Sequence, residues 1–283
     1  DDTRHWGPPF IEREDDRTAA YFFAANRGKR SVMLDFSDPD DLATLTGLAR
    51  EADILVENFK VGGLRKFGLD YETLSKANPG LVYCSITGFG QTGPYAGRAG
   101  YDYLTQGMSG LMSITGAPDG EPQRVGVAVT DIFSGLYGVI GILSALRLRD
   151  ETGRGQHIDI ALLDSATAIL ANQVMNFFAT GQAPGRTGNA HPNIVPYQVF
   201  PVADGDMIIA TGNDGQYRRL CGVLGLEHLA DHPDYMTNLN AYFERLSAAY
   251  REIRERHGLV IWDGFMCHKC AYMQIECDID RAH

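Results

Sequence analysis

The chain has 283 residues and a formal net charge of -11, from 36 acidic and 25 basic side chains, and 44% of its residues are hydrophobic. This length and apolar content suffice for one large domain or two smaller ones with a buried core, which excludes a disordered chain. The acidic balance argues against a binder of duplex nucleic acid, because such proteins neutralise phosphates with Lys and Arg. We expect no membrane contact, since no apolar run approaches the roughly 20 residues of a membrane helix.

Cysteine usage and the first residues bear on the compartment. The chain has five cysteines, three of them in the last 17 residues. This pattern does not suit a secreted disulfide scaffold and favours a reducing compartment. The chain begins Asp1-Asp2-Thr3, without a Met or a signal segment, which indicates that an upstream segment is missing. We expect a cytoplasmic location, with the mitochondrial matrix as the alternative because a targeting peptide would precede residue 1.

Strands and helices alternate in the first third of the chain. The expected elements are a strand over 30–36, a helix over 38–49, a strand over 54–56, short helices over 64–69 and 71–77, a turn at 78–80 and a strand over 81–86. The helix over 38–49 starts with Asp38 and Pro39, a typical N-terminal pair. Alternation of this kind predicts a parallel sheet with helices on its faces.

The remaining elements follow from glycine-rich loops and apolar spacing. They are a loop over 88–100, a helix over 101–112, an extended run over 124–129, a helix from 131 to 146, a strand or helix entry at 158–161, a helix over 162–178, a loop over 184–196, a hairpin over 197–211, and helices over 216–224 and 242–257. In the helix from 131 to 146, apolar residues recur every three or four positions and predict a buried helix. Its glycines 135, 138 and 141 form a face that a neighbouring backbone could approach.

Together these elements predict the α/β class, with a Rossmann-like parallel-sheet large domain and part of a small α+β domain. The expected organisation is a large domain over 1–185 that lacks its first strand, a linker over 186–196, a partial small domain over 197–257 and a separate tail over 258–283.

Several common catalytic motifs are absent from the sequence. There is no phosphate-cradling G-x-x-x-x-G-K-[ST], no nucleophile elbow G-x-S-x-G and no zinc-binding H-E-x-x-H. The short glycine pairs Gly97/Gly100 and Gly153/Gly155 lack the dinucleotide spacing. Nicotinamide chemistry is therefore disfavoured.

Asp131 is the most informative single position. It stands where the extended run over 124–129 meets an apolar helix, so its carboxylate is expected at or next to the helix N-terminus. One interpretation is an N-cap, because Asp is among the preferred N-cap residues. The other is a carboxylate nucleophile that stays ionised at neutral pH. Position alone does not choose between them.

Five motifs occur in an order and spacing that resemble a known family. They are Val56-Glu57-Asn58-Phe59, Gly63-Leu64-Arg65-Lys66-Phe67-Gly68, Tyr83-Cys84-Ser85-Ile86-Thr87-Gly88-Phe89-Gly90, Thr152-Gly153-Arg154-Gly155-Gln156 and Gly188-Asn189-Ala190-His191-Pro192. The chain from Asp1 to about Tyr250 resembles the family III coenzyme A transferases. This CaiB/BaiF family includes formyl-CoA transferase, carnitine CoA-transferase and the 2-methylacyl-CoA racemases. The resemblance implies that the chain is cut at both ends.

The resemblance places the family's catalytic aspartate on Asp131. Asp159 and Asp164, which lie near a family motif, are expected to be cap or helix-face carboxylates. The implied reaction moves CoA from an acyl-CoA to a carboxylic acid through a covalent aspartyl intermediate. CoA is then a substrate, and the resemblance implies no metal and no prosthetic group.

The resemblance also implies a CoA site at the strand ends of the parallel sheet. The residues carried over are Leu34, Asp35, Phe36 and Ser37 for the adenine side, Asn58, Phe59 and Lys60 for the nucleotide and pantetheine, Lys66 for the phosphates, and Tyr101 and Asp102 along the thioester arm. Each has an ordinary alternative, such as core packing for the aromatic residues and solvated helix faces for the lysines.

Tyr101 separates transfer from racemisation within the family. The racemases use a His at the matching place as an acid-base group, whereas Tyr, with an ordinary pKa near 10, is a poor base at neutral pH. Transfer is therefore favoured. The racemase remains the enzymatic alternative, and an inactive CoA-binding or interaction protein is the alternative outside the enzymes.

The substrate, the assembly and the tail carry weaker expectations. Arg98, Arg124 or Arg186 could pair a second carboxylate, as with a succinyl-CoA donor and a dicarboxylic acceptor. The family forms interlocked homodimers, which we expect of the full-length chain. The tail contains Cys267, Cys270, Cys277 and nearby His residues, but a single C-x-x-C predicts zinc only weakly, and a terminus outside the family is the favoured interpretation.

Overall fold

The computed structural model describes residues 1–13 and 16–235. The expected helix over 242–257 and the tail over 258–283, with its cysteines, lie outside these residues. Of the expected small domain over 197–257, the structure describes residues 197–235.

The backbone forms two compact units, and each unit contains two stretches of chain. Among the described residues, unit 1 comprises Asp1–Ile86 and Gly138–Asp159, while unit 2 comprises Thr87–Tyr137 and residues 160–235. This division differs from the expected boundary at residues 186–196. One of its borders lies between Tyr137 and Gly138, inside the long helix over 129–152, so that one end of this helix belongs to each unit. The expected domain bounds stay predictions.

Unit 1 begins with a small antiparallel pair and continues into a parallel sheet. Its elements are η1 (Asp2–His5), β1 (Phe10–Arg13), β2 (Asp16–Ala19), α1 (Ala20–Ala25), α2 (Pro39–Glu51), β3 (Ile54–Glu57), η2 (Arg65–Phe67), α3 (Tyr71–Ala77), β4 (Val82–Thr87), the C-terminal part of α5 (Val129–Thr152) and most of β5 (His157–Ala161). Sequence analysis did not anticipate the β1–β2 pair, because its strands are polar and mostly exposed.

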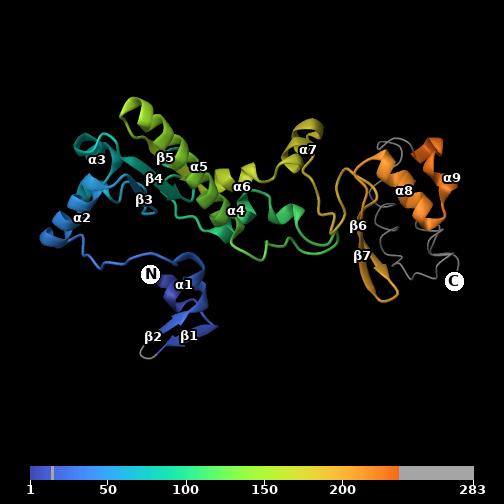
Figure 1. Cartoon of the computed structure of the whole chain (residues 1–283), viewed down its shortest axis with the longest axis horizontal. Coiled ribbons are helices and arrows are strands. Elements are labelled where there is room, and N and C mark those ends of the chain that lie inside the picture. The colour runs from blue at the N-terminus through green and yellow to red at the C-terminus, as the bar shows by residue number, and fades with distance from the viewer. Residues whose placement is uncertain (14–15, 236–283) are drawn as a thin grey trace. The chain divides into compact units, whose positions relative to one another are not determined.

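The sheet of unit 1 confirms the predicted α/β class. Its strand order is β3-β4-β5, and β3 pairs with β4 in parallel, with Ile54 opposite Val82 (Figure 1). The helix α2 starts as the sequence predicts, since Asp38 accepts hydrogen bonds from the two backbone amides that follow Pro39. The core beneath the sheet consists of Ala49, Leu64, Leu69, Leu74, Leu81 and Tyr83.

Two glycines let α5 approach the sheet of unit 1. A methyl group added at Gly138 would lie 3.7 Å from Cys84 Sγ of β4, and one added at Gly141 would lie 3.0 Å from Ile158 of β5. Because glycine has no side chain, the backbone of α5 can lie close to these strands at both positions. This close approach confirms the expected glycine face for Gly138 and Gly141, whereas a methyl group added at Gly135 would meet nothing within 4 Å.

The opposite face of α5 is exposed, so the expectation of a fully buried helix is wrong. Its apolar stripe consists of Ile132, Leu136, Val139, Ile140 and Leu143, and about half of each residue's surface is accessible. The sequence predicted no membrane helix, yet α5 has the length and composition to cross a membrane. Its contacts with β4 and β5 instead resemble those of a helix packed on a protein sheet.

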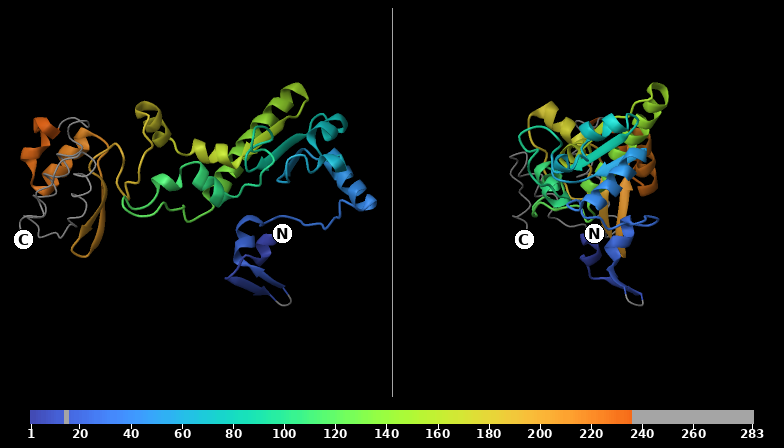
Figure 2. Two further views of the ribbon diagram at one scale, coloured as in Figure 1. Left: turned by 180° about the vertical axis from the view of Figure 1, so that it is seen from behind. Right: turned by 90° about the vertical axis from the view of Figure 1, so that its left-hand side faces the viewer.

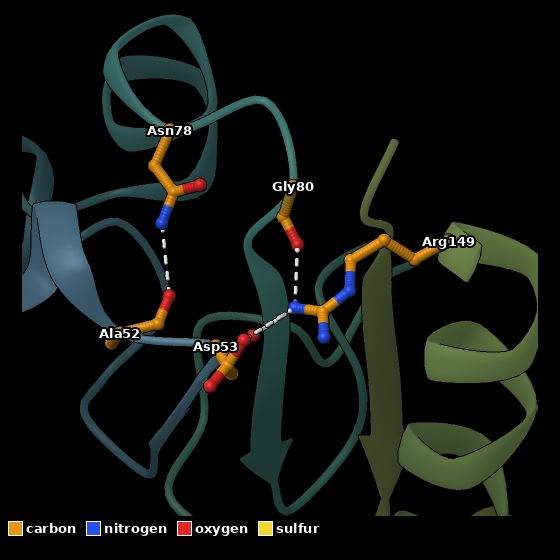
Figure 3. A network of polar contacts seen from close by, with 5 residues as sticks. All are labelled: Ala52, Asp53, Asn78, Gly80 and Arg149. Carbon is orange, nitrogen blue, oxygen red and sulfur yellow. Dashed lines mark hydrogen bonds and ion pairs between the residues drawn. The ribbon is translucent and has the colours of Figure 1, made fainter. Parts of the chain in front are cut away.

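The C-terminal end of α5 is fastened by Arg149. Its Nη1 donates to the Asp53 carboxylate at 2.9 Å and to the Gly80 carbonyl at 3.3 Å, which ties the helix to the amino ends of β3 and β4 (Figure 3). Asn78 donates to the Ala52 carbonyl at 2.9 Å in the same region. A cation in the last turn also suits the negative end of the helix dipole.

Unit 2 combines short helices with a hairpin. Its elements are α4 (Asp102–Met108), η3 (Met112–Ile114), the start of α5, the end of β5, α6 (Leu162–Ala168), α7 (Asn172–Thr180), β6 (Tyr197–Val202), β7 (Gly205–Ala210), α8 (Asp214–Leu224), α9 (Glu227–Ala230) and η4 (Pro233–Tyr235). The hairpin β6–β7, orange in Figure 2, confirms the predicted turn around Ala203-Asp204. The end of α8 at Gly225, with a φ of 68°, is also as predicted.

Three predicted elements are corrected. Residues 30–36 form no strand, because they pair with none of the described strands and leave Met33 96% exposed. The extended run predicted over 124–129 ends one residue earlier, since α5 already begins at Val129. The predicted helix over 162–178 is two helices, broken where Ala171 adopts a φ of 46°.

Candidate active site

Asp131 lies in the first turn of α5. Ile132 N donates to the Ala128 carbonyl at 3.1 Å, which makes Ala128 the N-cap position and Asp131 the third residue of the helix. The interpretation of Asp131 as the N-cap is therefore wrong, and its carboxylate is not needed to cap its own helix.

Asp102, at the start of α4, provides that capping contact from another helix. Its Oδ1 accepts from Thr130 N at 2.9 Å and from Thr130 Oγ1 at 2.8 Å. A helix N-terminus leaves its first amides without intrahelical partners, and an anion there also suits the helix dipole. The capping role that the sequence left open for Asp131 thus belongs to Asp102.

Buried polar side chains extend this contact. Gln106 Nε2 donates to Asp102 Oδ2 at 2.8 Å, and Gln106 Oε1 accepts from Val125 N at 2.8 Å. Thr105 Oγ1 lies 2.9 Å from Thr130 Oγ1, and Thr105, Gln106 and Thr130 are fully buried. Sequence analysis missed these three residues. The available signal was the pair of adjacent polar residues at 105 and 106, which follow Tyr103 and Leu104 in the helix.

The surroundings of Asp131 disfavour its charged form. Asp131 is exposed as a whole residue, but partial desolvation of its carboxylate by the surrounding protein raises the pKa of Asp131 above its ordinary value. The negative charge of Asp102 raises it further. Such a carboxylate is a stronger base and nucleophile when ionised than an ordinary surface Asp.

The residues predicted for the adenine side form the turn that leads into α2. Asp35 Oδ1 accepts from Ser37 N at 2.8 Å and from Ser37 Oγ at 2.5 Å, and these hydrogen bonds lower the pKa of Asp35. Leu34 is partly buried, while Phe36 packs against the core of unit 1. Asp35 and Ser37 thus stabilise their own turn, and a contact with CoA stays a prediction.

The structure brings some of the residues predicted to contact the nucleotide, pantetheine and phosphates of CoA next to this turn. The ring centroids of Phe36 and Phe59 lie 5.8 Å apart, and Phe59 follows the carboxyl end of β3. Lys66 Nζ lies 4.5 Å from the ring centroid of Phe67, which itself contacts Phe36. Asn58 and Lys60 flank Phe59 and are exposed. These residues therefore gather at a strand end, as ligand-binding residues do in open α/β sheets.

Tyr101 and Asp102 belong to unit 2, like Asp131. Tyr101 occupies the N-cap position of α4 and is 72% exposed. The loop before it is tight, because a methyl group at Gly88 would lie 2.5 Å from the Gly100 Cα. This glycine contact fixes where α4 begins, and it was not identified from the sequence.

The three candidate arginines differ in what they already bind. Arg186 donates to three backbone carbonyls, of Ser113, Ala117 and Gly120. Arg98 lies over the Tyr95 ring, with 4.3 Å between its Cζ and the centroid. Arg124 uses Nη1 for the carbonyls of Val125 and Gly126, directly before α5.

Asp164 lies in the first turn of α6, as expected of a helix-face carboxylate. Asp159 lies on strand β5, so the expectation of a cap or helix-face carboxylate is wrong for this residue. Within residues 1–13 and 16–235, no three His, Cys, Asp or Glu side chains are grouped to hold a metal ion.

The whole matched sequence settles the family. The family model described as CoA-transferase family III matches residues 1–267 of the chain. The chain belongs to this family. The match continues past residue 250, where the resemblance quoted above ends, into the first residues of the segment 258–283.

Named relatives of this CoA-transferase family III chain include enzymes for dicarboxylic acids. It is 59% identical over 240 residues to the succinate–glutarate CoA-transferase of Agrobacterium fabrum, covering 84% of the chain and 60% of that enzyme. It is 41% identical over 265 residues to the acetyl-CoA:oxalate CoA-transferase of Acetobacter aceti, covering 93% of the chain and 67% of that enzyme. The chain thus spans about two thirds or less of these relatives.

A solved structure supports the same family. The crystal structure of a CaiB/BaiF family protein from Brucella suis superposes with a TM-score of 0.76 at 52% sequence identity, covering 98% of the chain and 72% of that protein. The α/β class with its parallel sheet is therefore that of the family.

Proposed function

We propose that the protein containing this chain transfers CoA between an acyl-CoA and a carboxylic acid, with Asp131 as the nucleophile. The observation that carries the proposal is a partly desolvated aspartate in the first turn of α5 that is not used as a cap, in a chain of CoA-transferase family III. A carboxylate with a raised pKa is suited to attack a thioester carbonyl.

The proposed reaction has four balanced steps. The Asp131 carboxylate attacks the acyl-CoA carbonyl and expels CoA thiolate, which forms a mixed anhydride. The thiolate then attacks the Asp131 carbonyl, which releases the donor acid and leaves an aspartyl-CoA thioester. The acceptor carboxylate attacks this thioester to form a second anhydride and expels the thiolate again. The thiolate finally attacks the acceptor carbonyl, which gives the new acyl-CoA and restores Asp131.

The proposed substrates are succinyl-CoA and a second dicarboxylic acid. Relatives named for glutarate and oxalate support this class of acceptor. A dicarboxylic acid needs a cation for its unreacting carboxylate. Arg124 is the strongest candidate, because it lies five residues before the start of α5 and donates to protein carbonyls through Nη1. Arg186, by contrast, is committed to three carbonyls.

The direct test incubates the full-length protein with succinyl-CoA and glutarate and follows CoA thioesters by mass spectrometry. The proposal expects glutaryl-CoA and succinate in equal amounts. The proposal is contradicted if succinyl-CoA is only hydrolysed to succinate and free CoA, and no new CoA thioester forms from glutarate or from any other carboxylic acid offered.

The role of Arg124 has its own test. Arg124→Leu should raise KM for the dicarboxylic acceptor about tenfold or more, because one charge-assisted contact is lost, while KM for the acyl-CoA stays within about twofold. Arg98→Leu is the matched control from the same unit. An equal effect of both variants contradicts the assignment.

The two alternatives give distinct outcomes in the same preparation. A racemase would exchange the α-proton of a 2-methylacyl-CoA with deuterated water and form no new thioester. The exposed Tyr101, at the place where the racemases have His, disfavours this outcome. An inactive binding protein would bind CoA in calorimetry and show neither activity.

We also propose that a second copy of the chain covers the exposed stripe of α5. The stripe is apolar, continuous along one helix face and about half exposed, as at an interface. A homodimer in light scattering, converted to monomer by Ile140→Glu, is the expected result. A wild-type monomer at the same concentrations contradicts this proposal.

The compartment and the remaining partners are proposals of the same kind. Among the described residues, Cys84 and Cys221 are buried and form no disulfide, which is consistent with a reducing, cytoplasmic location. We propose acyl-CoA and a small carboxylic acid as the ligands, with no prosthetic group, no nucleic acid and no membrane. Fractionation of cells that express the full-length protein tests the location and the membrane together.

A further inference from the structure

Asp102 accepts three hydrogen bonds, and all of them constrain the start of α5 or the chain just before it. Oδ1 accepts the backbone amide and the hydroxyl of Thr130, and Oδ2 accepts the amide of Gln106. Thr130 directly precedes Asp131 in the helix. Gln106 in turn accepts from Val125 N, so the segment that enters the helix is held as well.

We propose that Asp102 is a positioning residue for the nucleophile: it fixes the first turn of α5, and its charge favours conversion of Asp131 into a neutral acyl adduct. This inference rests on the proposed function and deepens it. It also gives Asp102 a role other than the contact with the thioester arm that the resemblance implies.

The direction of the hydrogen bonds calls for a carboxylate at this position. Val125 N donates to Gln106 Oε1, so the Gln106 amide must point its Nε2 at Asp102. Thr130 N donates to the other oxygen. Both oxygens must therefore accept, as an ionised carboxylate does and an amide cannot. An Asn at 102 would place its own donor against either Thr130 N or Gln106 Nε2.

Burial makes this junction rigid. Thr105, Gln106 and Thr130 are fully buried, and a buried polar group that loses its partner costs the full desolvation of that group. The first turn of α5 therefore has one low-energy arrangement relative to α4. Because Asp131 follows Thr130 in that turn, the same contacts set the position of its Cα and the direction of its Cα–Cβ bond.

The charge of Asp102 acts on the chemistry of Asp131 as well. The ionised Asp131 carries a negative charge near another carboxylate, and this repulsion vanishes when acylation makes Asp131 neutral. The other charged or titratable groups on the adjoining segments are Tyr101 and Tyr103 on α4, Arg124 before α5, and Asp164 on α6. Asp102 alone adds to burial in raising the pKa of Asp131.

The test uses two substitutions in the full-length protein, with Asp164→Asn as the matched control. Asp102→Ala removes the cap, and hydrogen exchange of the Thr130 amide should become at least about tenfold faster. Asp102→Asn removes the charge. It should lower kcat about 10- to 100-fold, leave KM for the acyl-CoA within about twofold, and move the acidic limb of the pH profile of kcat/KM to lower pH.

Thr130→Val tests the same proposal if both Asp102 substitutions unfold the protein. Thr130→Val retains the amide that donates to Asp102 and loses only the hydroxyl. It should lower kcat less than Asp102→Asn and leave the acidic limb where it is in the wild type. A shifted limb in Thr130→Val contradicts the assignment of the charge effect to Asp102.

Other outcomes separate this inference from the proposed function. A raised KM for acyl-CoA with unchanged kcat in Asp102→Asn identifies Asp102 as a CoA contact and overturns the inference, as does unchanged exchange of the Thr130 amide in Asp102→Ala. If the wild-type protein transfers no CoA, the proposed function is refuted. If hydrogen exchange of the Thr130 amide is nevertheless faster in Asp102→Ala, the capping role of Asp102 stands.

Discussion

The two ends of α5 treat charge in opposite ways. At the C-terminal end, the cation of Arg149 meets the Asp53 carboxylate and the Gly80 carbonyl, so charge and dipole are matched. At the N-terminal end, Asp131 has a second carboxylate, Asp102, as the charged neighbour that shifts its pKa upward. Matched charges are typical of a stabilising contact, whereas like charges held together by other bonds are typical of a functional site. We therefore expect α5 to be held in place at its C-terminal end and, in the proposed function, to carry the nucleophile at its N-terminal end.

The largest expected effect concerns the N-terminal end. Asp131→Ala should reduce the rate of CoA transfer at least about a thousandfold, because removal of a covalent nucleophile leaves only binding and orientation. The rate is measured with succinyl-CoA and glutarate. Asp164→Asn, which removes a carboxylate from the first turn of α6, should stay within about twofold of the wild type. If Asp131→Ala keeps more than a tenth of the rate, Asp131 is not the nucleophile.

The next effect concerns the turn that follows the C-terminal end. A methyl group at Gly155 would lie 2.0 Å from the Leu81 carbonyl oxygen, so Gly155→Ala forces backbone to move and should cost about 3 kcal/mol of unfolding free energy. Gly135→Ala is the matched control, because its methyl group meets nothing within 4 Å and alanine favours a helix by about 1 kcal/mol. Chemical denaturation measures both. Similar stability of the two variants would show that the turn is not tightly packed.

A smaller effect is expected at Arg149. Arg149→Met should destabilise the protein by about 1 kcal/mol, because the variant leaves the Gly80 carbonyl without this donor while the exposed Asp53 keeps its water. Asp53→Asn should cost less, since an exposed ion pair contributes little. Denaturation midpoints and CoA-transfer rates are measured together. A loss of activity at constant stability in Arg149→Met would contradict the division of α5 into a fastening end and a reactive end.

The smallest effect is a pH dependence of stability. The pKa of Asp131 is raised in the folded state, so the folded state binds a proton there more tightly than the unfolded chain. The protonated residue therefore stabilises the fold at low pH, and this contribution is lost as pH rises through the folded-state pKa. Asp131→Asn should be slightly more stable than the wild type at neutral pH and equal to it below about pH 4. Equal stability of Asp131→Asn and the wild type at every pH would show that the folded protein does not disfavour the ionised form of Asp131.

Local sequence signals predicted local elements well. The helix over 71–77, the hairpin around Ala203-Asp204 and the helix closed by Gly225 depend on caps and turn residues within a few positions, and the structure confirms them. The strand expected over 30–36 failed because alternation alone supplies no partner strand. The burial of α5 was overestimated, since spacing identifies an apolar face without showing what covers it.

The candidate site was predictable only in part. The position of Asp131 at the start of a helix follows from the sequence, and its role as the nucleophile is implied by the resemblance to the family. The contact of Asp102 with Thr130 joins residues 28 positions apart in sequence, and no local rule connects them. The sequence therefore offered two interpretations of Asp131, and the structure removed one of them by showing which carboxylate caps the helix.

The nucleophilic role of Asp131 is tested most directly by following oxygen atoms. In the proposed steps, one oxygen of Asp131 leaves with the donor acid, and one oxygen of the acceptor carboxylate remains on Asp131. Turnover with an acceptor acid labelled with heavy oxygen should therefore label the tryptic peptide 125–147, in which Asp131 is the only acidic side chain. We expect heavy oxygen on Asp131 after turnover. Rapid CoA transfer with no label in this peptide would contradict it.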